Sequence, residues 1–112
     1  MALTVSRVPW NGPIAGVRVG RVEGAWILNP TFQQLEFSDV DLIVSGSADS
    51  IVMVEGGALE LSEAEIVKAL EVAHKGVTEL LDVADELSRD VRQPKMEWTK
   101  VEPAAELVAR VK

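Results

Sequence analysis

Two aspartates, Asp39 and Asp41, stand one residue apart just before an apolar run, and their carboxylates are the groups in this chain best suited to chemistry. Side chains alternate between the two faces of an extended segment, so both carboxylates would share a face if the strand begins by Asp39. Such a pair can hold Mg²⁺ together with phosphate oxygens. The alternative, which we favour, is that the two aspartates cap and solvate the entry to the strand.

Arg18 and Arg21 carry most of the positive charge of the first predicted hairpin. Charged groups on the solvated side of a half-buried strand would explain them, and contact with RNA or another subunit is the alternative. We therefore keep Arg18 and Arg21 as candidate RNA-binding residues. The chain has 18 acidic and 11 basic residues and a net charge of −7. Because neutralisation of phosphates drives RNA affinity, we expect RNA binding by this chain alone to be weak and salt-sensitive.

Other reactive groups are sparse. The chain has no cysteine and one histidine, His74, which argues against disulfides, a cysteine nucleophile and a transition-metal site. The glycines near the first hairpin lack the strand–loop–helix setting of a phosphate-binding loop. We predict no catalytic residue and no metal ligand here. Trp10, Trp26 and Trp98 are interpreted as anchors in the core or at an interface, with base stacking by Trp98 as the alternative.

Four strands are predicted to carry these residues. Alternating apolar positions predict a strand over residues 14–22, and Glu23-Gly24 turns the chain into a partner strand over 25–28. A third strand over 41–45 is apolar at three successive positions, so we expect it to be covered on both faces. A fourth strand over 51–54, ended by Gly56-Gly57, follows after a connection short enough to favour antiparallel pairing.

Helices complete an α+β fold, in which a four-stranded, mainly antiparallel sheet is followed by one long amphipathic helix. Thr31 and Gln34 form a capping box before a short helical turn, and Ser62 and Glu65 form another before the long helix, over 63–90. A short C-terminal helix over 104–112 follows an irregular linker over 95–103. The predicted apolar stripe of the long helix comprises Ile66, Leu70, Ala73, Val77, Leu80, Ala84, Leu87 and Val91.

Several strings of the chain resemble bacterial polynucleotide phosphorylase (polyribonucleotide nucleotidyltransferase). They are RVPWNGPIAGVRVGRVEG, LNPT, DVDLIVSG, MVEGGALELSE and QPKMEWTKVEP, and they occur in family order over nearly the whole chain. The resemblance is to the second half of the first RNase PH-like domain. It implies that residues 1–93 are the C-terminal half of that domain and that 94–112 are a linker and the start of a helical domain. We therefore expect the chain to be a piece of a larger enzyme.

The resemblance also implies an activity for the larger enzyme. The family degrades RNA from the 3′ end with inorganic phosphate and Mg²⁺, releases nucleoside diphosphates and forms a homotrimer. Its catalytic domain has two carboxylates six positions apart; Asp41 matches the later one, whereas Leu35 occupies the earlier position. This departure implies a structural copy with no cofactor of its own, inactive when isolated. A non-enzymatic α+β oligomerisation or interaction module, natural or engineered, is the alternative.

Location and assembly follow from the same features. The lack of cysteine, of a signal-peptide pattern and of a membrane-spanning apolar run favours a cytoplasmic protein without membrane contact. An isolated half-domain should expose apolar surface and self-associate, most simply as a dimer. The candidate surfaces are one side of the sheet over 14–54 and the helix flank at Leu80, Leu81 and Leu87.

Overall fold

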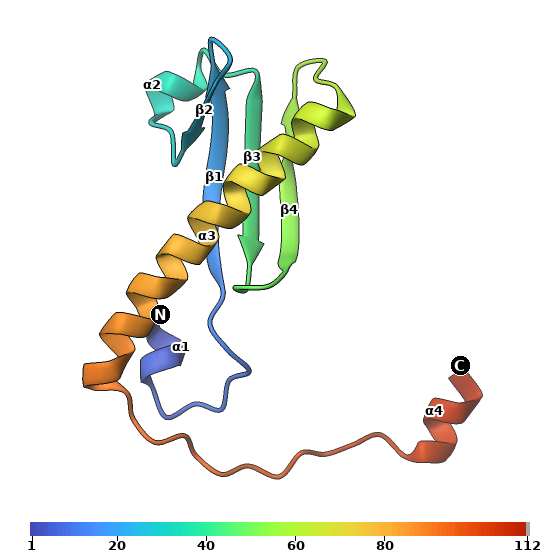
Figure 1. Ribbon diagram of the computed structural model, residues 1–112. Helices are drawn as coiled ribbons and strands as arrows, with labels where there is room; N and C mark the ends of the chain where they lie inside the picture. Colours follow the sequence, from blue (N-terminus) through green and yellow to red (C-terminus); the bar gives the residue numbers. More distant parts are fainter. Residues whose placement is uncertain (112) are drawn as a thin grey trace.

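The computed structural model describes residues 1–111 and consists of one antiparallel sheet with a long helix across it, which confirms the predicted α+β class (Figure 1). The predicted C-terminal helix is present, but Lys112 lies outside the described residues. The strands are β1 (Ala15–Val22), β2 (Ala25–Leu28), β3 (Val40–Gly46) and β4 (Ile51–Ala58), in the spatial order β2-β1-β3-β4. The helices are α1 (Ala2–Val5), α2 (Phe32–Leu35), α3 (Glu63–Val91) and α4 (Ala105–Val111).

The β1–β2 hairpin closes through the predicted two-residue turn. Glu23 and Gly24 both have positive φ, at 50° and 80°, as a type I′ turn requires. Val22 pairs with Ala25, and on its other side β1 pairs with β3, with Arg18 opposite Ile43. The central position of β1 therefore places its two arginines beside residues from the start of β3.

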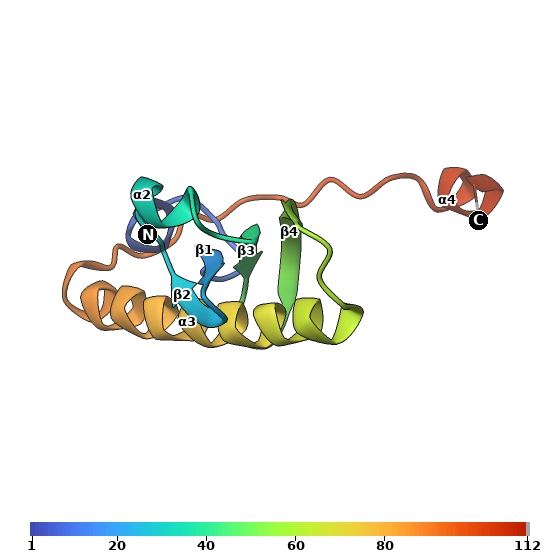
Figure 2. The ribbon, with the colours of Figure 1, turned by 90° about the horizontal axis from the view of Figure 1, so that it is seen from above.

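α3 covers one face of the sheet, and Figure 2 shows the strands as a layer on one side of this helix. The Ser62–Glu65 capping box begins the helix as predicted. Apolar residues of β1 and β3 meet small residues of the helix in one core. Its members are Val17, Val19, Val40, Leu42, Val44, Ala69, Ala73, Val77 and Leu81.

The prediction that the third strand is covered on both faces is wrong. Burial alternates along β3: Leu42 and Val44 are buried, whereas Ile43 between them is 40% exposed. The single long helix covers only the face that carries Leu42 and Val44. The opposite face of the sheet stays open at Ile43, and three successive apolar residues did not distinguish these arrangements.

The predicted apolar stripe of the long helix is only partly correct. Ala73, Val77 and Ala84 are buried as expected, but Leu80, Leu87 and Val91 are exposed. Ala69, Leu81 and Ser88 are buried although the stripe omits them. The cause is Gly76, where an added Cβ would lie 2.8 Å from Leu28 Cδ1, so the helix approaches the sheet through its smallest side chains.

The fourth strand is longer than predicted, because Gly56-Gly57 lies inside β4 instead of ending it. Gly56 has φ of +144° and passes so close to β3 that a Cβ would lie 1.9 Å from the Asp41 carbonyl oxygen. Glycine is therefore required for the pairing of Leu42 with Gly56, and the strand continues through it.

The N-terminal segment and the linker after α3 lie side by side. The Gln93 and Met96 backbone amides donate to the Val5 and Arg7 carbonyls. Lys95 Nζ donates to three carbonyl oxygens of the first segment, those of Leu3, Thr4 and Ser6, at 2.7, 3.0 and 2.8 Å. Beyond this contact the chain runs extended to α4 (Figure 1). Across residues 1–111, no helix is both long and apolar enough to cross a bilayer.

Candidate functional site

Asp41, the acid singled out by the sequence, is held by Arg18 from the adjacent strand. Arg18 Nε donates to Asp41 Oδ1 at 2.7 Å and Arg18 Nη2 donates to Asp41 Oδ2 at 2.6 Å, so the guanidinium binds both carboxylate oxygens. This bidentate bond holds the pKa of Asp41 below its usual range. Both side chains are partly exposed. Asp41 is therefore an ionised carboxylate whose two oxygens are already occupied by a cation.

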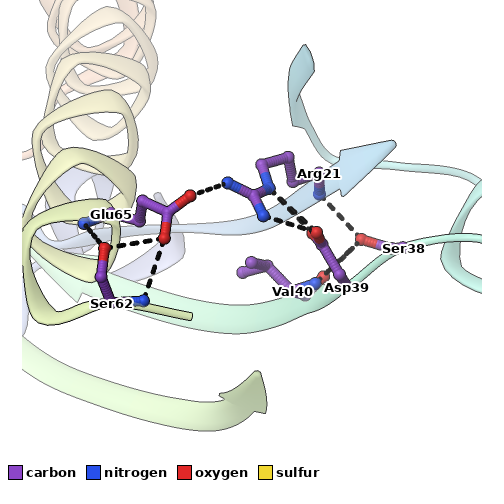
Figure 3. Close-up of polar contacts among 6 residues, drawn as sticks. All are labelled: Arg21, Ser38, Asp39, Val40, Ser62 and Glu65. Carbon is purple, nitrogen blue, oxygen red and sulfur yellow. Dashed lines mark hydrogen bonds and ion pairs between the residues drawn. The ribbon is translucent and has the colours of Figure 1, made fainter. Parts of the chain in front are cut away.

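Arg21 forms the second and larger cluster, which joins the sheet to the long helix (Figure 3). Its Nη2 donates to Asp39 Oδ2 at 2.6 Å, and its Nη1 donates to Glu65 Oε1 at 2.6 Å. The guanidinium also lies over the Trp26 ring, 5.4 Å from the ring centroid. Only 16% of the Arg21 side chain is exposed, so this arginine is the most enclosed charged group of the cluster.

The carboxylates around Arg21 are strongly acidic. Hydrogen bonds from Arg21 and then from Ser62 lower the pKa of Glu65 to about 2. The bond from Arg21 also lowers the pKa of Asp39, while the two carboxylates raise the pKa of Arg21. All three groups are therefore charged at neutral pH.

Backbone contacts fix where these side chains stand. The Ser38 hydroxyl accepts from the Arg21 amide at 2.7 Å and donates to the Val40 carbonyl at 2.5 Å, which ties the start of β3 to β1. At the helix, the Ser62 amide donates to Glu65 Oε2 at 2.9 Å (Figure 3). Glu65 therefore caps α3 with one oxygen and binds Arg21 with the other.

Asp39 and Asp41 do not form a shared metal site on one face of the strand. β3 begins at Val40, not by Asp39, and the two aspartates bind different guanidinium groups. The earlier position of the expected acid pair, Leu35, ends the short helix α2 and offers no ligand. Among residues 1–111, no three His, Asp or Glu side chains gather as a metal site. The surroundings of Asp41 do not fit Mg²⁺, because the Arg18 guanidinium places a positive charge on the carboxylate and no further carboxylate or imidazole joins it among the described residues.

The other singled-out residues fall outside these clusters. His74 Nε2 lies 3.2 Å from the Ser47 carbonyl oxygen, at the boundary between α3 and the β3–β4 connection. Trp26 packs against the core as predicted and Trp10 is partly buried. Trp98 is 63% exposed, which excludes the core and leaves an interface, or base stacking, as its predicted place. The linker carries Trp98 away from the core.

Two members of the polar site were missed from the sequence as partners of arginine. Glu65 was identified only as a capping residue, and Ser38 was not identified as a site residue. The Ser-x-x-Glu pattern does predict that one oxygen of Glu65 faces the helix end. It contains no signal for Arg21, which is 44 positions away.

The fold defines an α+β domain whose two aspartates are neutralised by arginines, and comparison with known proteins gives the family. The model of domain 2 of the 3′ exoribonuclease family matches residues 12–76, and the chain belongs to this family. Over 111 residues, 99% of the chain, it is 57% identical to a polyribonucleotide nucleotidyltransferase of Gemmatimonas aurantiaca. It is 48% identical over 105 residues, 94% of the chain, to the enzyme of that name from Thermus thermophilus. The chain spans 15% of the length of each of these relatives.

Proposed function

We propose that this chain is a non-catalytic segment of a phosphorolytic 3′-to-5′ exoribonuclease, in which it serves as scaffold and assembly surface. The observation that supports this most is the bidentate Arg18–Asp41 bond. The guanidinium neutralises the charge of this carboxylate and holds both of its oxygens, which weakens it as a metal ligand and as a base. Leu35 at the partner position supports the same conclusion.

The larger enzyme supplies the chemistry in this proposal. It would degrade RNA with inorganic phosphate and Mg²⁺, release nucleoside diphosphates and act as a homotrimer in the cytoplasm. Residues 1–93 would form the C-terminal half of its first RNase PH-like domain, and 94–112 would lead into its helical domain. RNA would reach this chain through the assembled enzyme, because Arg18 and Arg21 already bind carboxylates.

Mn²⁺, a paramagnetic substitute for Mg²⁺, tests whether the site around Asp41 is closed to metal. We expect about 1 mM Mn²⁺ to broaden the amide resonances of residues 39–41 no more than those of other exposed acids, because the donor set is incomplete. The matched control is Arg18→Gln, which frees the carboxylate of Asp41. Selective broadening at 39–41 in the unaltered chain would contradict the proposal.

A second candidate function, an oligomerisation module, is favoured by β4. This edge strand is exposed at every residue, and its run of large apolar side chains, Ile51–Val54, is 38–62% exposed. An open, apolar edge recruits another strand, and a second copy supplies an identical one across a two-fold axis. The helix flank expected to contribute is reduced, because Leu81 is buried.

Val52→Lys is expected to abolish self-association, because a lysine on an edge strand opposes pairing. Light scattering at micromolar concentration should give a mass above one 12.1 kDa chain for the unaltered protein and a monomer for Val52→Lys. Val101→Lys, in the exposed linker, is the matched control and should still associate. A monomeric unaltered chain, or association that persists in Val52→Lys, would refute pairing through β4.

A further inference from the structure

The C-terminal half of α3 carries an apolar stripe that the described residues, including the neighbouring α1, leave about half exposed. Ala69, Ala73 and Gly76 are buried against the sheet at helical spacings of four and three. Continuing that spacing gives Leu80, Val83, Leu87 and Val91, which we call the overhang stripe. These four side chains are 41–57% exposed. The segment 80–91 that carries them is the part of α3 that extends past the sheet (Figures 1 and 2).

Side-chain size changes along this one helix face. Alanine and glycine occur where the helix presses on β1 and β2, as the contact between Gly76 and Leu28 shows. Leucine and valine occur in the overhang stripe. Large aliphatic residues at spacings of three and four suit a packing partner about 8–10 Å away, the usual distance between the axes of two packed helices. The stripe is therefore shaped for another helix.

Charge beside the overhang stripe selects the kind of helix. Glu79, Glu86 and Asp90 follow its outer side at spacings of seven and four, and all three are exposed. Within residues 1–111 none of the three has an ion-pair partner. On the other side of the stripe, Leu81 and Ser88 are buried. A partner therefore meets an apolar stripe bordered by carboxylates on its only open side.

A second copy of this chain is a poor occupant. Residues 79–91 contain five acids and one base, Arg89, which is itself engaged with Asp85. Pairing two such helices would bring carboxylates against carboxylates, and like charges at an interface oppose association. The sheet edge at β4 has no comparable charge, so the two exposed surfaces suit different partners.

We propose that the overhang stripe is the docking site of a basic amphipathic helix, one with Leu, Ile or Val at spacings of three and four and Lys or Arg beside them. The Leu, Ile or Val side chains of the partner helix would pack on the overhang stripe. Its flanking Lys or Arg side chains would pair with Glu79, Glu86 and Asp90. This proposal goes beyond the scaffold role and does not depend on RNA processing.

Two synthetic peptides of about 18 residues test the proposal, because they share one leucine stripe and differ only in lysine or glutamate flanks. With the isotope-labelled 112-residue chain, the lysine peptide should shift the amide resonances of residues 79–91. It should bind about tenfold more tightly than the glutamate peptide at low salt, and the difference should shrink as salt is added. Replacing Glu79, Glu86 and Asp90 together with Lys should reverse the preference.

Matched variants distinguish binding at the overhang stripe from nonspecific hydrophobic binding elsewhere on the helix. Leu87→Gln should weaken binding of the lysine peptide about tenfold. Val67→Gln, on the same helix outside the overhang stripe, should leave binding unchanged, although Val67 is 57% exposed and Leu87 only 45%. Equal affinity for both peptides, no binding of the lysine peptide at millimolar concentration, or shifts centred on β4 would each overturn the proposal. Self-association of the unaltered chain would also overturn the proposal if Leu87→Gln abolished that self-association.

Discussion

Arg21→Met should lower the resistance of this chain to urea more than removal of any other charged side chain. Arg21 binds Asp39 and Glu65 at once and stacks on Trp26, and its side chain is mostly enclosed. Methionine keeps much of the volume but leaves two carboxylates without a cation between β1 and α3. We expect a lower urea midpoint at pH 7, measured by circular dichroism.

Low pH should weaken the same Arg21 cluster. Arg21 and Ser62 lower the pKa of Glu65 from 4.5 to about 2, so the folded chain binds fewer protons than the unfolded one in this range. The stability due to Glu65 is therefore present above pH 4.5 and is lost as the pH falls towards 2. The urea midpoint of the unaltered chain should fall over this window, and that of Arg21→Met should fall less.

The control for Arg21 is Arg89→Met, because Arg89 is 74% exposed and makes one long ion pair, 3.4 Å, with Asp85. Exposed pairs of this kind contribute little to stability. The urea midpoint of Arg89→Met should stay close to that of the unaltered chain. Equal losses in the two variants would show that the Arg21 cluster does not join the sheet to the helix.

Gly56→Ala is the second exchange expected to have a large effect. Alanine would have to adopt φ near +144°, and its Cβ would overlap the Asp41 carbonyl oxygen. Strained backbone of this kind costs about 1–3 kcal/mol, and relief of the overlap requires β4 to separate from β3. We expect a loss at or above the top of that range in the free energy of unfolding, measured by urea titration.

Gly57→Ala provides a matched control one residue away. An added Cβ at Gly57 meets nothing within 4 Å, and its φ is outside the positive region. The free energy of unfolding of this variant should change by less than about 1 kcal/mol. If Gly56→Ala were as mild as Gly57→Ala, the close approach of β4 to β3 would not exist as described.

The elements of the fold could largely be predicted from local sequence patterns. Glu23-Gly24 predicted the hairpin, and the Ser62–Glu65 capping box predicted the start of α3, because turns and caps depend on a few neighbouring residues. The extent of β4 could not be predicted this way. Glycines usually interrupt strands, and the reason for Gly56, its approach to β3, arises only when distant residues pair.

The candidate site shows the same division. Asp39, Asp41, Arg18 and Arg21 were identified from residue type and spacing, but their pairing was not. Each ion pair joins residues 18 to 44 positions apart, and sequence spacing does not predict contacts at such separations. The buried face of α3 differs from the predicted stripe for a related reason, because Gly76 fits against Leu28 only after the sheet has formed.

The central claim, that Asp41 has a structural role and no catalytic one, is tested most directly by phosphorolysis. The purified 112-residue chain would be incubated with an RNA homopolymer, inorganic phosphate and Mg²⁺, and nucleoside diphosphates would be quantified by chromatography. We predict no phosphate-dependent release above the blank, because Arg18 occupies the carboxylate and Leu35 replaces its partner acid. Release that persists in Asp41→Asn would identify a contaminating enzyme. Release by the unaltered chain that Asp41→Asn abolishes would contradict the claim.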